Sequence, residues 1–234
     1  MTPCFSAVKL LLHLPSFKSF LTKVIQALAA LAVFTLLPLC AASIDDLTYT
    51  SGDSSVTITD CDESASGTLV IPDTIDGVVV ISIGNNTFNN CDSLTSITLP
   101  DSVISIGNRA FFDCESLESI TIPDDVTSIG YDAFYNCDSL KSVTIGYGVT
   151  SIGSAAFYGC TSLTSINFLP MTAPSLDTDV FANLPDSARY NTPAGATGYT
   201  DPFGGVSNVD TDGDGVGDVS DAFPNDATET VDTD

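Results

Sequence analysis

The sequence lacks tryptophan, contains one histidine, His13, and has only six Lys and Arg residues among its 234 positions. Against these stand 30 Asp and Glu residues, which give a formal charge of −24. A nucleic-acid-binding surface needs clustered Lys and Arg to neutralise phosphates, so this composition excludes that class of partner. Hydrophobic residues nevertheless make up 44% of the chain, enough to build a folded core.

The first 42 residues have the organisation of a secretory signal peptide. Lys9, Lys18 and Lys23 precede an apolar run from Val24 to Leu39, and the small residues 40–43 follow. Cleavage is expected near Ala42 or Ser43. The alternative is an uncleaved anchor, but Gln26 and Pro38 interrupt a run that is shorter than the roughly 20 residues of a spanning helix. We therefore predict a secreted or cell-surface protein with no transmembrane span in the mature chain.

Cleavage would leave three basic residues against all 30 acidic ones, a formal charge of −27, and would remove His13. A mature chain without histidine excludes Ser-His-Asp triads, Cys-His dyads and histidine zinc sites. Glycoside hydrolysis by paired carboxylates stays formally open, but no acidic pair stands out from so many. We predict that the protein is not an enzyme.

A 23-residue repeat fills the middle of the chain. Residues 98–120, 121–143 and 144–166 align without a gap, and residues 69–97 align after an insertion around Asp76 to Val80. Four columns recur at steps of 23: Ile83, Ile106, Ile129, Ile152; Phe88, Phe111, Phe134, Phe157; Cys91, Cys114, Cys137, Cys160; and Leu94, Leu117, Leu140, Leu163.

Within one unit the apolar spacing changes from three to two. Phe111, Cys114, Leu117 and Ile120 are three apart, which suits a helical or 3-10 turn, whereas Ile120 and Ile122 are two apart, which suits a strand. We therefore predict that each unit forms one coil. A single coil cannot bury its apolar face, so the coils must stack. The expected fold is mainly β, a solenoid over residues 69–168, with a sharp corner at the glycine that follows each second apolar pair.

The pattern CxxLxxIxLPxxVxxIGxxAFxx, which begins at Cys91, resembles the leucine-rich repeats of the BspA-like surface protein family. The resemblance covers about residues 69–168. It implies a curved, β-rich solenoid and a secreted or cell-surface binding protein without catalysis, of a kind often linked to adhesion. The last unit departs from the pattern, because residues 146–148 replace its Pro and Asp.

Both ends of a solenoid need covers. Residues 43–68 contain two alternating segments, 47–50 and 56–59, around a Gly-Asp-Ser turn, which predicts a β-hairpin cap. Residues 169–208 are rich in aromatic and turn residues and are interpreted as an irregular C-terminal cap or linker. This second segment resembles the terminal segments that close repeats of the same family.

The cysteine column allows two interpretations. Stacked Cα atoms about 5 Å apart fall within disulfide range, and a secreted protein meets an oxidising space. Parallel Cβ vectors do not favour a bridge, however, and buried cysteine packs as a small apolar residue. We favour free thiols in this column, and Cys61 has no evident partner by periodicity.

A further set of polar residues, seven with hydroxyl groups and one with an amide, lies beside the inward-facing residues of each strand. It comprises Ser96, Thr98, Ser119, Thr121, Ser142, Thr144, Ser165 and Asn167. One interpretation is a ligand-binding face for an extracellular protein or glycan, because solenoids commonly bind ligands along one face. The other is that threonine simply suits an exposed strand.

The acidic segment 209–234 is a candidate calcium loop. Asp210, Asp212 and Asp214 occupy loop positions 1, 3 and 5, the Val216 carbonyl position 7, and Asp218 and Asp221 positions 9 and 12. Pro224 opposes the helix that an EF-hand or dockerin would need. The segment instead resembles thrombospondin type 3 repeats, which implies Ca²⁺ as the cofactor. Residues 231–234 repeat residues 209–212, so we expect a truncated array.

Three functional hypotheses follow. The leading one is a non-enzymatic binding or adhesion protein whose solenoid recognises an extracellular protein or glycan while the tail binds calcium. The second is a purely structural surface or matrix repeat protein. The third is a secreted carbohydrate-active enzyme that uses paired carboxylates, for which no acidic pair can be named.

Overall fold

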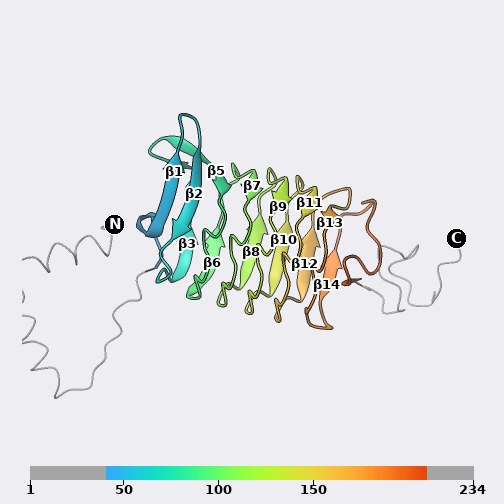
Figure 1. The fold of residues 1–234 in the computed structure, drawn as a ribbon. Helices are drawn as coiled ribbons and strands as arrows, with labels where there is room; N and C mark the ends of the chain where they lie inside the picture. Colours follow the sequence, from blue (N-terminus) through green and yellow to red (C-terminus); the bar gives the residue numbers. More distant parts are fainter. Residues whose placement is uncertain (1–40, 210–234) are drawn as a thin grey trace, which may run out of the picture.

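The structure, a computed structural model, describes residues 41–209. These residues form an elongated stack of coils, and the strands of the coils make up two sheets (Figure 1). A 3-10 turn, Ile44–Asp46, precedes the strands. The eight-stranded sheet contains, in spatial order, β1 (Leu47–Ser51), β2 (Val56–Cys61), β5 (Val78–Ile83), β7 (Ser105–Ile106), β9 (Ser128–Ile129), β11 (Ser151–Ile152) and β13 (Ser175–Leu176), with β4 (Thr74–Ile75) paired to β5. The seven-stranded sheet contains β3 (Gly67–Val70), β6 (Leu94–Thr98), β8 (Ser119–Ile122), β10 (Ser142–Ile145), β12 (Ser165–Phe168), β14 (Arg189–Asn191) and β15 (Ser207–Asn208).

Strand pairing follows the sequence repeat. Ile106 pairs with Ile129 in one sheet and Ser142 pairs with Ser165 in the other, in both cases parallel and 23 residues apart. Each coil contributes one strand to each sheet, so neighbouring coils are joined by two parallel ladders. The predicted mainly β solenoid of 23-residue repeats is confirmed.

The core is a set of identical residues stacked along the solenoid. The Phe88, Phe111, Phe134 and Phe157 rings are fully buried and stack with centroid distances of 4.9, 4.8 and 5.0 Å. Their planes are within 9° of parallel, as expected when equivalent residues on successive coils repeat at the strand spacing. The leucine and isoleucine columns fill the space between the two sheets in the same way.

Glycine is required where each coil turns out of the eight-stranded sheet. A Cβ on Gly130 would lie 2.6 Å from the Asn108 nitrogen and 2.6 Å from the carbonyl carbon of Gly107. These are backbone atoms of the preceding coil, which have little room to move. The glycine column therefore brings the backbones of successive coils together at this corner.

The N-terminal cap is a hairpin that continues one sheet. Strands β1 and β2 pair antiparallel, as predicted, and β2 then pairs parallel with β5, Ile58 opposite Ile83. Strand β3 extends the other sheet through its pairing with β6. The hairpin thus covers the first coil and places an antiparallel strand at the edge of the sheet.

Coil stacking also continues into residues 169–208. Phe181 stacks on Phe157 at 5.5 Å, and β14 pairs with β12, Tyr190 opposite Ile166. Beyond it an aromatic cluster packs around Phe168, where the Tyr199 hydroxyl donates a hydrogen bond to the Pro170 carbonyl at 3.0 Å. Burial is the main reason why the pKa of Tyr199 rises to about 12.

The cysteine column consists of buried free thiols in the described part of the chain. The Cys114, Cys137 and Cys160 thiols each donate to a phenylalanine carbonyl oxygen 26 residues earlier, at 3.1 Å. Cys61, which periodicity left without a partner, lies beside Cys91, since a hydrogen bond between the two thiols is the main cause that raises the pKa of Cys61. The column therefore begins one coil earlier than the repeat indicates.

The Cys61 and Cys137 thiols, whose pKa values are raised in the folded protein, should make the protein less stable at alkaline pH. Burial raises the pKa of Cys137, with smaller contributions from the Cys114 and Cys160 thiols, so the folded thiol stays protonated where the unfolded one ionises above about 8.5. The unfolded state then binds fewer protons, and each such thiol should lower the free energy of unfolding by roughly 1.4 kcal/mol per pH unit above that value.

Urea unfolding between pH 7.5 and 10 measures this dependence. Cys137→Ala should be less stable at every pH because it leaves a cavity, but its stability should fall less steeply with pH. If the free energy of unfolding fell equally steeply with pH in the parent and in Cys137→Ala, the raised pKa of the Cys137 thiol would be contradicted. In urea without reductant, all five described cysteines should react with a thiol reagent.

Candidate functional site on the seven-stranded sheet

Structure places the eight predicted binding residues on one outward face, which we call the serine–threonine face. The residues alternate with buried Ile97, Ile120, Val143 and Ile166, so the period of two that buries the isoleucines turns the hydroxyl groups outward. All eight are exposed or half-buried. The face comprises Ser96 and Thr98 of β6, Ser119 and Thr121 of β8, Ser142 and Thr144 of β10, and Ser165 and Asn167 of β12.

The residues form two rows that run across the strands. Ser119, Ser142 and Ser165 are direct register partners in one row, and Thr121, Thr144 and Asn167 in the other. Strands in a sheet are about 4.8 Å apart, so each row presents donors and acceptors at that interval. The arrangement suits an extended ligand that offers hydrogen-bonding groups at repeated positions.

Sequence reasoning missed the ends of these rows. Thr68 of β3 pairs with Ser96, and Arg189 of β14 pairs with Ser165. Asn191 extends the second row and donates from Nδ2 to the Asn167 Oδ1 at 2.6 Å. The insertion in the first unit and the irregular spacing after Phe168 hide these positions from the 23-residue step.

A hollow of about 320 Å³ opens on this face between β6 and β8. Ser96 pairs with Ser119 there, and no later pair follows, whereas β8 and β10 pair over four residues. The strands separate beyond that single pair, and the hydroxyl-bearing residues of both strands line the gap, with Asp101 beside them. The hollow thus gathers four of the eight predicted residues: Ser96, Thr98, Ser119 and Thr121.

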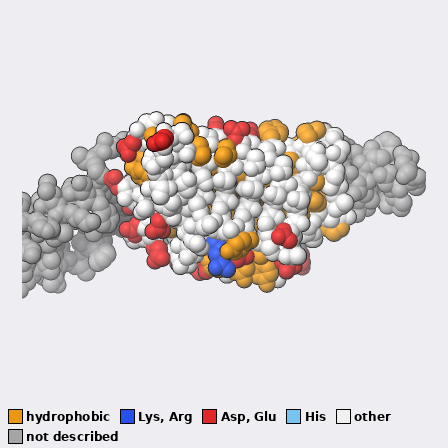
Figure 2. Space-filling view, turned by 45° about the horizontal axis from the view of Figure 1, so that its top comes forward, with side chains coloured by type: hydrophobic (Ala, Val, Ile, Leu, Met, Phe, Trp, Pro, Cys, Tyr) orange, Lys and Arg blue, Asp and Glu red, His pale blue; other side chains and the backbone are white. Residues whose placement is uncertain are grey.

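The electrostatic surroundings are acidic with few basic groups. Figure 2, which draws one side of the molecule, shows a mostly uncharged surface with scattered acidic patches and one small basic area. At the border of the face, the Lys141 Nζ lies 3.0 Å from the Glu118 Oε2, and both side chains are more than half exposed. Such an exposed pair contributes little stability. The face therefore suits a neutral or basic ligand rather than a polyanion.

The opposite sheet carries a second row of serines that the sequence analysis did not single out. Ser105 pairs with Ser82 and with Ser128, and the Ser82 and Ser105 hydroxyl oxygens are 2.9 Å apart. Ser151 and Ser175 continue the row. A serine before each inward isoleucine at steps of 23 was the available signal. Apart from β5, these strands have only two residues each, so the sheet presents one row rather than two and the serine–threonine face offers more contacts.

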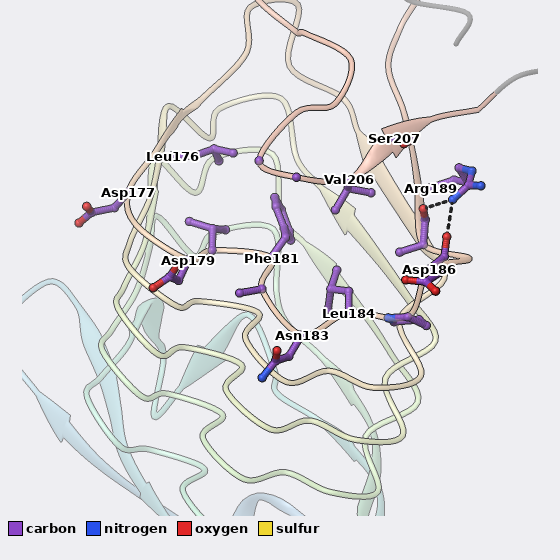
Figure 3. Close-up of a pocket in the computed structure, with 16 residues that line it drawn as sticks. Leu176, Asp177, Asp179, Phe181, Asn183, Leu184, Asp186, Arg189, Val206 and Ser207 are labelled. Carbon is purple, nitrogen blue, oxygen red and sulfur yellow. Dashed lines mark hydrogen bonds between the residues drawn. The ribbon is translucent and has the colours of Figure 1, made fainter. Parts of the chain in front are cut away.

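A further hollow of about 630 Å³ lies at the C-terminal end of the described coils (Figure 3). The turn that contains Phe181 forms one side, and residues 204–207 form the other. Arg189 lies at its border, where its Nη1 donates to the Asp186 and Ala188 carbonyl oxygens at 2.8 and 2.7 Å. Three aspartates, Asp177, Asp179 and Asp186, also line it.

The predicted metal ligands lie beyond this part of the chain. Between residues 41 and 209 no group of three or more His, Cys, Asp or Glu side chains could hold a metal ion. The six predicted calcium ligands, Asp210, Asp212, Asp214, Val216, Asp218 and Asp221, lie outside the described residues, as does nearly all of the predicted signal peptide. Within the same described range no helix has the length and hydrophobicity needed to cross a bilayer.

Comparison with known proteins gives a family and a fold. The model of the BspA type leucine rich repeat region matches residues 80–198 in six copies. A leucine-rich repeat protein from T. pallidum has a similar structure, with a TM-score of 0.51 and 26% identity over 67% of this chain and 66% of that protein.

Two further solved structures match at TM-scores below 0.5. A leucine-rich repeat protein from Bacteroides capillosus ATCC 29799 is 32% identical over 53% of this chain and 94% of its own, with a TM-score of 0.47. A leucine rich cell surface protein from Faecalibacterium prausnitzii A2-165 is 24% identical over 63% of this chain and 53% of its own, with a TM-score of 0.41. None of the curated proteins compared matches the chain. Because the family model covers just over half of the 234 residues, the chain belongs to the BspA-type leucine-rich repeat family.

Proposed function

We propose that the protein is a secreted or cell-surface binding protein whose serine–threonine face recognises an extracellular protein or glycan. Leucine-rich repeat proteins are generally non-enzymatic binding scaffolds, which supports the general class. The observation that carries the specific proposal is the two rows of register partners, which contain seven of the eight polar residues, together with the hollow between β6 and β8. The leader pattern of residues 1–42 supports secretion.

The chemistry of the face favours a neutral ligand that forms many hydrogen bonds. Serine, threonine and asparagine both donate and accept, and a row of them can meet sugar hydroxyls or the peptide groups of an extended segment. The side chains stand on a backbone fixed by parallel ladders on both sides, so little conformational entropy is lost when the ligand binds. Repeated weak contacts along the rows would then add up in one ligand.

An array of glycans and extracellular proteins, probed with and without calcium, tests the proposal. We expect saturable binding that Ser119→Arg weakens at least about tenfold, because the long charged side chain would fill the hollow. Ser128→Arg on the opposite sheet is the matched control and should leave the affinity unchanged. Absence of any saturable ligand would favour the purely structural alternative, and equal losses in both variants would remove the assignment to this face.

We further propose that residues 210–221 bind calcium. Carboxylates at loop positions 1, 3, 5, 9 and 12, with a glycine at position 6, match the oxygen-rich coordination that Ca²⁺ prefers. The neutralised carboxylates would repel one another less, so the segment would become more compact. The functional consequence would be a stiffened spacer next to the binding solenoid.

Titration calorimetry on the mature chain tests the calcium site. Asp212→Asn combined with Asp214→Asn should lower calcium affinity at least about tenfold, since two charged ligands are lost. The control, Asp125→Asn on the exposed surface of the solenoid, should bind calcium as the parent does. No calcium-dependent heat in the parent, or no change in protease resistance after Asp210, would contradict the proposal.

A further inference from the structure

The turns that follow the eight-stranded sheet are held together by a repeated set of backbone hydrogen bonds. Each turn donates three alternate N–H groups to carbonyl oxygens of the next turn. Asp132, Phe134 and Asn136, for example, donate to Ser154, Ala156 and Tyr158 at 2.9, 2.7 and 2.9 Å. The same three bonds join residues 86–90 to 108–112, residues 109–113 to 131–135, and residues 155–159 to 178–182. We call these stacked turns the turn column.

The last turn of the column, residues 179–183, has no successor in the described chain. The N–H groups of Asp179, Phe181 and Asn183 would be its three donors, and none of them donates to a backbone or side-chain acceptor within residues 41–209. The hollow of about 630 Å³ lies beside this turn, with Leu184 and Val206 on opposite sides (Figure 3). This end of the column therefore offers three aligned donors and a space in which another segment can lie.

A sixth copy of the turn sequence exists in the tail. Residues 132–136 read Asp-Ala-Phe-Tyr-Asn, and residues 221–225 read Asp-Ala-Phe-Pro-Asn. In the described turns the first and last of these positions are left-handed, with φ of 52° and 54° at Asp132 and Asn136. Asp and Asn adopt that conformation more readily than other non-glycine residues. The likeness ends at Asp226, where earlier turns have Cys or Leu.

Proline at position 224 is compatible with this turn. The carbonyl of Phe134 accepts from Cys137, so residues 134–137 form a turn whose third residue, Asn136, has positive φ. Proline is common at the second position of such a turn, with Gly or Asn at the third. The equivalent Tyr135 N–H makes only a bond within its own turn, to Asp132 at 3.2 Å, and it is the Tyr135 carbonyl that joins two coils. Pro224 keeps that carbonyl.

The connection has the right length. Ser207 is in β15, a strand of the seven-stranded sheet, and Ser220 follows 13 residues later. Ser165 of β12 and Thr178, which opens the last described turn, are also 13 residues apart. The intervening loop between β14 and β15 carries no turn of this sequence, so the tail would have to shift by one coil level, about 5 Å, which is small for a connection of this length.

We propose that residues 220–225 dock on the C-terminal end of the turn column as its next turn. The carbonyl oxygens of Ser220, Ala222 and Pro224 would accept from Asp179, Phe181 and Asn183, and Phe223 would enter the hollow against Leu184 and Val206. The occupant is this segment of the same chain, because it combines the turn sequence with a connection of matching length. Its docking would cover an otherwise open end of the solenoid.

Amide hydrogen exchange of the mature chain, followed by NMR at about 0.15 M salt to screen the nearby aspartates, tests the docking. We expect the amides of Asp179, Phe181 and Asn183 to exchange at least about 100-fold more slowly than in an unfolded chain. Phe223→Ser should make these three amides exchange at least about tenfold faster than in the parent protein. Val231→Ser, elsewhere in the tail, is the matched control and should leave it unchanged.

Asp221→Asn separates the docking from calcium binding. Asn suits a left-handed position, so this variant should keep the amide protection while it weakens any calcium site that uses Asp221. Exchange of the three amides at unfolded-chain rates, or full protection in Phe223→Ser, would overturn the proposal. Protection that increases with protein concentration would also overturn it, because the cover would then be a second copy of the chain.

Discussion

Replacing Phe134 by alanine should lower the free energy of unfolding by about 3–5 kcal/mol. The ring is fully buried and stacks on Phe111 and Phe157 at 4.8 and 5.0 Å. Its removal leaves a cavity at the centre of the column, and each coil contacts only its neighbours. We therefore expect the cavity to lower the total stability and also to reduce the cooperativity with which the two halves of the solenoid unfold.

Thermal and urea unfolding measure both effects. For a domain of this size the loss corresponds to a fall in Tm of roughly 6–20 °C, and the urea transition should broaden as the halves uncouple. Tyr147→Ala is the control, since this side chain is 60% exposed and should change the stability little. A Phe134→Ala protein that unfolds like the parent would contradict the packing described here.

Gly130→Ala is the second substitution with a large expected effect, a loss of about 1–3 kcal/mol. Its Cβ would lie 2.6 Å from backbone atoms of the preceding coil, so the two coils would have to separate at this corner. Alanine also restricts the unfolded chain, which favours folding by about 0.4–1 kcal/mol, but the close contacts outweigh that gain.

Gly52→Ala provides the comparison in the same unfolding assay. In the β1–β2 loop a Cβ on Gly52 would approach only the Ser55 carbonyl oxygen, at 3.7 Å, an ordinary van der Waals contact. This variant should retain the parent's stability or gain slightly. If the two glycine variants behaved alike, close contact between coils would not be the reason for the glycine column.

The sequence predicts most of the fold because one arrangement of residues is repeated. Columns such as Phe88 to Phe157 recur at steps of 23, and only a stack of coils can bury them together. The period of two within each strand then assigns the outward face: once Ile120 is buried, Ser119 and Thr121 must point away from the core.

Features that break the repeat could not be predicted in the same way. Cys61 lies 30 residues before Cys91, so its place in the cysteine column depends on how the hairpin joins the sheet. The hollow between β6 and β8 arises because these two strands pair only at Ser96 and Ser119, whereas β8 pairs with β10 over four residues. Such local differences in strand separation arise from packing between whole coils and leave no mark in the residue types.

The constant register between Ile106, Ile129 and Ile152 also determines how the length of the solenoid can change when residues are inserted or deleted. One added or deleted unit of 23 residues would move everything beyond it by one strand spacing, about 4.8 Å, while every contact on either side stayed the same. Insertions of other lengths would put isoleucines out of step and require a bulge or a loop. The distance between the N-terminal hairpin and the aromatic cluster can therefore change only in steps of one coil, unless a bulge or a loop is added.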